Sequence, residues 1–497
     1  MNNQSSFNIF NVSDPKVKTL HYAWVAFFIT FFLWFCHVPL MPLIKETFNL
    51  SIEEAKALLF LNVALTIPAR TIVGSLVDRY GPRLMYSILL AVSGLIGYMF
   101  AWAQDYTQLA AARFLLGFSG AGFVIGIRLV TEWYPAKTAG TAQGIYGGWG
   151  NFGAAIANWA LPLMTIGFTA LLGNEYGWRV AISAVSTIAI IYSLVFYKGV
   201  RNTPAGATYF SPKKFGPMEV TSKLDFILYL IMLTPIFLAM AIISWRLSPA
   251  QVGLLSEGVT YTIWTGLFVW FVWGVFSSYR INRENLLQAP AEIHRYKFKQ
   301  VALLDLAYAV TFGSEVAVVS MMPLMFSDAD SYGFSIAKAS LMAGFFMAMN
   351  LIARPGGGWL SDRIGRKKTL LLTVIGSAIG YAGLAFITPD WSILAIGAVV
   401  LFCAFFVQAG AGATFGVVPT IKRRLTGQIA GMTGAYGNVG AASFLLVNSF
   451  FAPSIFFAVI AISCVVVFGL LLIFMDEPKG KIAEILPDGT VTYIEVS

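Results

Sequence analysis

Residues 69–79 read ARTIVGSLVDR, and residues 353–363 repeat the same pattern as ARPGGGWLSDR. In each stretch an arginine stands four residues before a glycine and eight before an aspartate, so Arg70 and Arg354 hold equivalent places. A guanidinium stays charged under physiological conditions, and at the centre of a membrane helix it costs at least about 2.5–3.5 kcal/mol. A chain that places one there twice, in the same frame, is expected to bind an anion.

The composition indicates a polytopic α-helical membrane protein. Hydrophobic residues make up 58% of the 497 residues and charged residues only 11%, against about 25% charged in soluble domains. A helix needs about 20 apolar residues to cross a hydrocarbon layer of about 30 Å, and the sequence lacks the short alternating segments of a membrane β-barrel. Apolar segments of sufficient length fall near residues 22–44, 57–77, 84–103, 108–132, 140–167, 178–198, 224–245, 254–278, 300–326, 336–360, 368–388, 392–418, 428–450 and 453–475.

These segments form two sets of six with two more between them, about 14 transmembrane helices in all. The predicted fold is all-α, with an N-terminal six-helix half (1–200) and a C-terminal six-helix half (300–475). Between them, residues 201–299 form cytoplasmic linkers around an inserted transmembrane hairpin (about 224–278). Residues 476–497 are expected to be a short, polar, flexible cytoplasmic tail.

The net charge of +9 reflects membrane topology rather than nucleic-acid binding. Lysines and arginines gather in alternate loops, such as those at Arg79, Lys137 and Lys422. By the positive-inside rule both termini face the cytoplasm, and no cleavable signal peptide is expected. We therefore expect a multi-pass protein of the cell membrane, surrounded by the lipid bilayer, acting as a monomer without a nucleic-acid partner.

Reactive and metal-binding residues are sparse. Three cysteines in apolar surroundings and three scattered histidines predict neither a disulfide framework nor a metal site. The sequence has no pairing of a nucleophile with a base and no cofactor motif. The chain is therefore not expected to be an enzyme or to hold a cofactor.

A glycine pattern repeats in nearly the same frame as the arginines. The pattern GxxxGxxGxxGNxGAA begins at Gly140 and again at Gly427, an offset of 287 residues against 284 for the arginines. Two unrelated motifs at nearly one offset indicate an internal duplication, and parallel six-helix repeats are the architecture of one large transporter class. Small residues let helices approach closely and also leave room for a small ligand. The signature glycines are Gly147, Gly150, Gly153, Gly434, Gly437 and Gly440.

Depth along the helices brings the repeated polar residues to one level. Arg70 and Arg354 each lie eight residues from the cytoplasmic aspartate, which is about 12 Å along a helix and close to the middle of the hydrocarbon layer. Asn151 and Asn438 lie at a similar depth in the glycine-rich helices. The sequence therefore predicts an anion site at the midplane, where transporters of this architecture bind their substrates.

The loops after Arg70 and Arg354 resemble the G-x-L-x-D-R-x-G-R-R signature of the major facilitator superfamily. The first copy departs from it mildly, with Pro82 before Arg83. The resemblance implies a gating element in which each aspartate pairs with helix ends and cations at the cytoplasmic side. The matching residues are Gly74, Asp78, Arg79, Gly358, Asp362 and Arg363.

Three further features resemble the nitrate/nitrite porter family of that superfamily: the paired arginines, the GxGNxG motif at residues 148–153 with its echo in the second half, and the segment from Tyr308 to Ser314. The resemblance implies an anion clamped between the two arginines. In such a site Asn151 would donate a hydrogen bond to an anion oxygen, with Asn438 at the same level, Tyr308 would hydrogen-bond to the anion, and Phe123 and Phe312 would enclose its plane. Nitrate suits this chemistry, because two guanidinium groups offer planar forks of donors to a flat monoanion.

Glu315 is the candidate proton carrier. An ionisable carboxyl inside a membrane helix is a functional candidate by default, and an acid after Gly313 resembles the proton-coupled branch of the family. The alternative is a static ion pair with Arg113, which the sequence places at the same outer level. Asp305 lies nearer the cytoplasmic end and is a weaker candidate.

Several functions stay open. Proton-coupled symport of nitrate is slightly favoured, while nitrate/nitrite exchange would need no titrating group. Transport of another small monoanion, such as formate, is a further alternative. A sensor is disfavoured because nothing in the sequence resembles an attached signalling domain.

Overall fold

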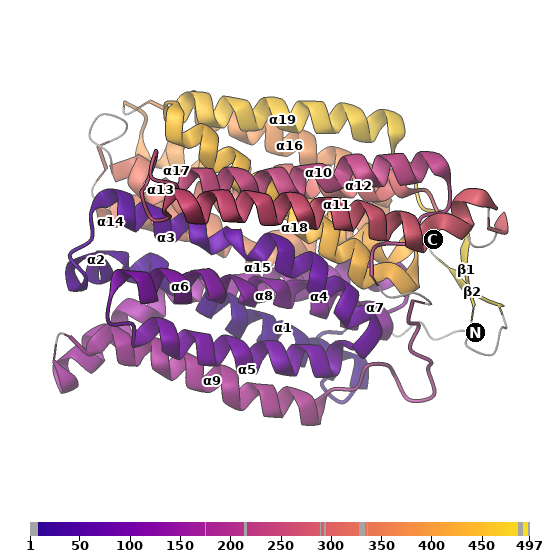
Figure 1. Ribbon diagram of the computed structural model, residues 1–497, viewed down its shortest axis with the longest axis horizontal. Helices are drawn as coiled ribbons and strands as arrows, with labels where there is room; N and C mark the ends of the chain where they lie inside the picture. Colours follow the sequence, from indigo (N-terminus) through magenta and orange to yellow (C-terminus); the bar gives the residue numbers. More distant parts are fainter. Residues whose placement is uncertain are drawn as a thin grey trace.

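A computed structural model describes residues 8–173, 175–212, 216–288, 290–292, 295–327, 333–334, 336–388, 390–485 and 491–495. Long helices run side by side along the longest axis of the molecule (Figure 1). The two halves lie on opposite sides of the bundle, and both ends of the chain lie at one end of it, here named the terminal end.

The N-terminal half contains nine helical elements. They are α1 (Pro15–Trp34), α2 (His37–Thr47), α3 (Ile52–Ala64), α4 (Thr66–Tyr80), α5 (Pro82–Ala101), α6 (Tyr106–Leu116) with the 3-10 turn η1 (Gly117–Ala121), α7 (Gly122–Trp133), α8 (Ala136–Leu172) and α9 (Gly177–Gly199). The consecutive pairs α1–α2, α3–α4 and α6–α7 each form one interrupted span.

The inserted hairpin consists of α10 (Lys223–Arg246) and α11 (Glu257–Leu287). The C-terminal half follows with α12 (Phe298–Tyr308), the π-helical turn η3 (Ala309–Gly313), α13 (Ser314–Ser327), α14 (Ile336–Ala348), α15 (Asn350–Ile364), α16 (Arg366–Ala385), α17 (Ile393–Val417), the 3-10 turns η4 (Val418–Thr420) and η5 (Arg423–Leu425), α18 (Thr426–Phe450) and α19 (Pro453–Phe474).

If interrupted pairs are counted as one, the described helices form fourteen long segments. Twelve helical segments of the described chain are long and apolar enough to cross a membrane. The other two segments are α14–α15, which carries Arg354, and the glycine-rich α18. That these two also cross the membrane, as α3–α4 and α8 do in the first half, stays a prediction from the sequence repeat.

Equivalent glycines end the two arginine helices. Gly81 caps α4 with φ +84°, and Gly365 caps α15 with φ +104°. Residues other than glycine rarely adopt such positive φ values, because their Cβ atom clashes with the backbone. Glycine therefore permits the sharp reversal of the chain at both places. The next helix starts immediately, at Pro82 and Arg366.

The tail contains two short strands that the sequence analysis did not predict. Strands β1 (Lys481–Ile485) and β2 (Val491–Glu495) pair antiparallel, with Lys481 opposite Glu495. Isoleucine, valine and threonine recur in these segments, and β-branched residues favour strands. At the start of the tail, hydrogen bonds from Lys297 and Lys299 lower the pKa of the Asp476 carboxyl.

The hairpin packs where the two halves meet. Helix α10 contacts α3 and α4 of the first half and α12 and α18 of the second, and Figure 1 shows α10 and α11 crossing the front of the bundle between the halves. The Tyr436 hydroxyl of α18 donates to the carbonyl of Met232 at 2.6 Å. The hairpin therefore covers one side of the interface between the halves.

Candidate substrate-binding site

Arg70 is fully buried and reaches from α4 toward the second half. Its Nε donates to the carbonyl of Gly120 at 3.0 Å, and its Nη1 donates to the carbonyl of Gly434, on α18, at 2.7 Å. Its Nη2 has no hydrogen-bond partner among the described residues. The Nη2 atom of Arg70 can therefore donate a hydrogen bond to a further acceptor inside the protein.

Arg354 is also fully buried, and it is held by side chains rather than by carbonyls. Its Nε donates to Asn350 Oδ1 at 2.6 Å, and its Nη2 pairs with Glu315 Oε2 at 2.9 Å. Asn350 also donates to the other carboxylate oxygen of Glu315 at 2.6 Å. As in Arg70, one nitrogen, Nη1, has no partner within the described structure.

Two of the signature glycines, Gly434 and Gly147, each contact the arginine of the opposite half. A Cβ on Gly434 would lie 3.1 Å from Cδ of Arg70, and one on Gly147 would lie 3.7 Å from Nη1 of Arg354. Each arginine thus packs against the glycine-rich helix of the opposite half. The two-fold relation predicted from the sequence repeat is therefore present in the contacts.

The other signature glycines serve close packing. A Cβ on Gly150 would lie 1.8 Å from the Phe27 ring, and one on Gly437 would lie 2.6 Å from the Phe312 ring. Gly153 and Gly440 press against backbone carbonyls, each of which a Cβ would approach to 2.3 Å. At Gly437 the absence of a side chain also lets Phe312, an aromatic residue of the candidate site, pack against α18.

Aromatic rings surround the arginines. The Phe312 ring centroid lies 5.0 Å from the guanidinium carbon of Arg70 and 5.3 Å from that of Arg354. Tyr308 is parallel to both Phe312 (4.9 Å, 6°) and Phe123 (6.0 Å, 2°). The predicted pair of enclosing rings is therefore a set of three parallel rings that includes Tyr308.

The π-helical turn η3 sets the geometry of this cluster. Tyr308 and Phe312 lie four residues apart at its boundaries, and such turns often occur at functional sites. The Tyr308 hydroxyl interacts with both guanidinium groups, yet it has no well-formed hydrogen bond in the described part of the chain. Phe415 of α17 closes the cluster edge-on, 4.8 Å from the Tyr308 ring.

The two asparagines lie beside this cluster on equivalent helices. Asn151 donates to the carbonyl of Gly147 at 2.6 Å, and Asn438 donates to that of Gly434 at 3.2 Å. The Oδ1 of Asn438 has no partner among the described atoms. Asn151 also lines a cavity of about 20 Å³ together with Phe312 and Glu315, so it lies close to the carboxylate that holds Arg354.

Asp78 and Asp362 close the terminal end by binding helix starts in the opposite half. Asp78 accepts hydrogen bonds from the backbone N–H groups of Gly427 and Gln428, both at 2.9 Å. Asp362 accepts those of Gly140 and Thr141 at 3.0 and 2.7 Å. Gly427 and Gln428 lie in the first turn of α18, where N–H groups are free and a carboxylate is stabilising, whereas Gly140 and Thr141 follow the first turn of α8.

An arginine lies beside each of these aspartates. Arg128 lies 3.1 Å from Asp78, and Arg366 lies 3.7 Å from Asp362. Arg79 instead lies over the Tyr80 ring, and Arg363 over the Trp359 ring. At the motif glycines, a Cβ on Gly74 or Gly358 would lie 2.3 or 2.0 Å from a carbonyl oxygen of the facing helix.

Glu315 does not form the ion pair with Arg113 that was considered from the sequence. Its partner is Arg354, whereas Arg113 donates to the carbonyl of Trp34 at 2.8 Å. Depth counting cannot separate these two arginines, because it gives the level of a residue and not the direction of its side chain. Asn350, which links Glu315 to Arg354, was missed, although its position four residues before Arg354 was a usable signal.

Asp305 is fully buried and accepts a hydrogen bond from Thr433 at 2.7 Å. The described residues contain no group of three or more histidine, cysteine, aspartate or glutamate side chains that could hold a metal ion.

Comparisons with known proteins identify the family. The sequence model of the Major Facilitator Superfamily matches residues 23–289 and 304–492. The nitrate/nitrite transporter NrtP of Nostoc punctiforme is 40% identical over 96% of this chain and 95% of its own length. The chain belongs to the nitrate/nitrite porter family of the major facilitator superfamily. It is thus a membrane transporter and not an enzyme, which confirms the predicted family and fold class.

Other relatives of this nitrate/nitrite porter are similar over most of its length. The NrtP protein of a Picosynechococcus species is 39% identical over 95% of both chains, and the high-affinity nitrate transporter 2.3 of rice (Oryza sativa subsp. japonica) is 27% identical over 88% of this chain and 73% of its own. Among solved structures, the proton:xylose symporter XylE aligns with a TM-score of 0.62 at 16% identity, covering 94% of this chain and 97% of XylE. That likeness shows the fold alone.

Proposed function

We propose that this transporter carries nitrate, nitrite or both across the cell membrane by alternating access, with the anion held between Arg70 and Arg354. The observation that carries the proposal is the pair of unpartnered guanidinium nitrogens, Nη2 of Arg70 and Nη1 of Arg354, both buried beside one aromatic cluster. Buried donors without a partner are costly. A small anion would accept a hydrogen bond from one such nitrogen of each half at the same time.

The surroundings favour a flat anion. Parallel rings of Phe123, Tyr308 and Phe312 would confine a planar ion without offering it competing charge. Tyr308 would donate its hydroxyl proton to one anion oxygen, and Asn151 would lie at the rim of the site. The names of the relatives, nitrate/nitrite and nitrate transporters, support nitrate and nitrite as the anions.

The contacts at the terminal end, which we take to be cytoplasmic, support alternating access. Asp78 and Asp362 join the halves there by hydrogen bonds to the starts of α18 and α8. Breaking both sets would let the halves rock apart and open the site to the cytoplasm. An anion bound to one arginine from each half would favour the closed arrangement around it.

Proton coupling is proposed to arise from competition for Arg354. With Glu315 ionised, its carboxylate occupies Nη2 of Arg354. An incoming monoanion meets less competition if Glu315 is protonated, because the neutral acid no longer attracts the guanidinium. The anion and the proton would then enter together, which is symport.

Anion exchange is the alternative. If Glu315 stays ionised throughout, nitrate and nitrite would replace one another between the arginines without a titrating group. Another small monoanion such as formate would use the same guanidinium groups, but the names of the relatives favour nitrate and nitrite over it.

Uptake into proteoliposomes tests the proposal. Labelled nitrate uptake is measured with an inward proton gradient alone, and then with internal nitrite alone. Uptake driven by the gradient supports symport, whereas uptake driven only by nitrite supports exchange and removes the proton role of Glu315. Absence of nitrate uptake in both arms, with formate transported, would overturn the assignment of the anion.

A further inference from the structure

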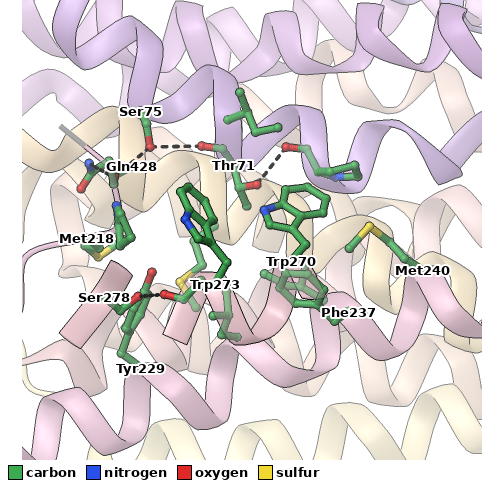
Figure 2. Close-up of a pocket in the computed structure, with 18 residues that line it drawn as sticks. Thr71, Ser75, Met218, Tyr229, Phe237, Met240, Trp270, Trp273, Ser278 and Gln428 are labelled. Carbon is green, nitrogen blue, oxygen red and sulfur yellow. Dashed lines mark hydrogen bonds between the residues drawn. The ribbon is translucent and has the colours of Figure 1, made fainter. Parts of the chain in front are cut away.

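A cavity of about 360 Å³ lies between the inserted hairpin and the interface of the two halves. Its walls come from α4 of the first half, α18 of the second, both hairpin helices and the linker residues before α10. Figure 2 shows Trp270 and Trp273 on the hairpin facing Thr71 and Ser75 on α4. Its volume falls in the range of about 300–1,000 Å³ that is usual for ligand pockets, and the transport mechanism does not use it.

The cavity is amphipathic along its length. In Figure 2, Gln428, Ser75 and Ser278 lie at one end of the cavity together with Met218, whereas Phe237 and Met240 lie at the other. The polar end is shallow in the membrane, because Ser75 stands only three residues before the gating aspartate Asp78. The apolar end lies at hydrocarbon depth.

The cavity reaches the membrane-facing surface. Ile72 and Trp273 line it, and they are 46% and 59% exposed. Side chains exposed at this depth of a membrane protein face lipid rather than water. The hydrocarbon layer is therefore the reservoir from which an occupant enters.

One buried polar atom at the shallow end has no partner. Gln428 is 5% exposed; its Nε2 donates to the carbonyl of Gly216 at 3.1 Å, whereas its Oε1 accepts no hydrogen bond among the described residues. An occupant that carries an N–H or O–H group would satisfy it. This atom distinguishes the cavity from an ordinary groove that any acyl chain could fill.

We propose that the cavity binds one membrane lipid whose headgroup carries a hydrogen-bond donor. An acyl chain would lie between Trp270 and Phe237, and an amine or hydroxyl of the headgroup would donate to Gln428 Oε1. The inserted hairpin thereby has a role, because α10 and α11 supply one wall of a lipid site that the two halves alone would leave open.

The site connects to the gate. The backbone N–H of Gln428 is one of the two donors that bind Asp78, so the lipid would touch α18 where α4 docks on it. A ligand shifts a conformational equilibrium only if it binds the two states with different affinity. A lipid that spans α4 and α18 meets that condition, and it favours the arrangement in which the terminal end is closed.

Photo-crosslinking tests the proposal on the full chain in nanodiscs. The probes are phosphatidylethanolamine and phosphatidylcholine, each with a diazirine on one acyl chain. The two headgroups have equal net charge, but only the first has N–H donors. We expect labelling on α4 and α11 to be about fivefold stronger with the first probe, the ratio expected from one net hydrogen bond. Equal labelling by both probes would overturn the headgroup contact.

Three variants separate a site from general lipid contact. Gly274→Phe fills the cavity, because a Cβ at Gly274 would meet only Leu233, at 3.9 Å. Gly266→Phe adds the same ring to the same helix in open space. We expect Gly274→Phe to reduce labelling about fivefold and Gly266→Phe to leave labelling unchanged. Gln428→Leu should make the labelling by the two probes equal. Equal labelling of the two phenylalanine variants, or a probe preference that survives Gln428→Leu, would contradict the proposal.

Discussion

At the scale of single residues, Arg354 is the residue at which we propose that substrate binding and proton coupling meet. Arg70 is held by backbone carbonyls, which cannot titrate, whereas Arg354 is held by Glu315 and Asn350. The two arginines are equivalent by sequence but not by partner. The sequence repeat reveals the pair, and only the side-chain directions reveal that one of them is bound to a carboxylate.

Replacing either arginine by lysine should weaken nitrate binding by about 10–100-fold, because a point charge cannot hold its fixed partners and also present a second donor to the anion. Equilibrium binding of labelled nitrate to purified Arg70→Lys and Arg354→Lys measures the loss. Wild-type affinity in either variant would contradict the clamp.

Glu315→Gln should abolish the stimulation of nitrate uptake by a proton gradient and retain exchange against internal nitrite, because glutamine cannot titrate and attracts Arg354 only weakly. Nitrate uptake into proteoliposomes is measured with the proton gradient alone and with internal nitrite alone, so the two activities are separated. Asp305→Asn is the matched control. Asp305 is buried with a hydrogen bond from Thr433, and a neutral acid suits that setting better than a charge. Gradient-driven uptake that survives Glu315→Gln would remove its proton role.

At the scale of helices, the terminal gate depends on close backbone approach. The sequence motif indicates which glycines recur, but not what they touch. In the structure Gly74 and Gly358 each face a carbonyl of the opposite half. The bonded pairs that lock this approach, Asp78 to α18 and Asp362 to α8, join residues that are hundreds of positions apart in the chain.

Gly358→Ala should hold the terminal end open, because its Cβ would lie 2.0 Å from the carbonyl oxygen of Gly140. The readout is the alkylation rate of a cysteine introduced by Ser361→Cys, a side chain that is 1% exposed. We expect a rise of about tenfold, equivalent to about 1.4 kcal/mol of overpacking.

Gly356→Ala is the control for this variant, since a Cβ there would meet nothing within 4 Å. A rate equal to that of the control would argue against the backbone contact as the basis of closure.

Two elements could not be predicted from the sequence, each for a physical reason. The π-helical turn η3 depends on how Tyr308 and Phe312 pack against Gly437, which is a tertiary contact. The β1–β2 pair in the tail is too short to distinguish from a polar extension by hydrophobic pattern alone. Composition and loop charge, in contrast, suffice for the fourteen-span plan, because spanning helices must be about 20 apolar residues long.

At the scale of the whole molecule, the protein is two related halves that exchange contacts across one interface. Each half contributes one arginine, one aspartate near the terminal end and one glycine-rich helix, and each of these contacts the other half. The inserted hairpin lies beside the same interface through its contacts with α4 and α18. In the proposed mechanism, the substrate, the terminal contacts and the lipid therefore all act on the relative position of the halves.

A structure of the protein with bound nitrate tests the central claim most directly. We predict that the anion lies within hydrogen-bonding distance of Arg70 Nη2 and Arg354 Nη1, beside the Phe312 ring, and that the contact between Glu315 and Arg354 lengthens from 2.9 Å. Nitrate bound elsewhere, with both guanidinium nitrogens still unpartnered, would contradict the account.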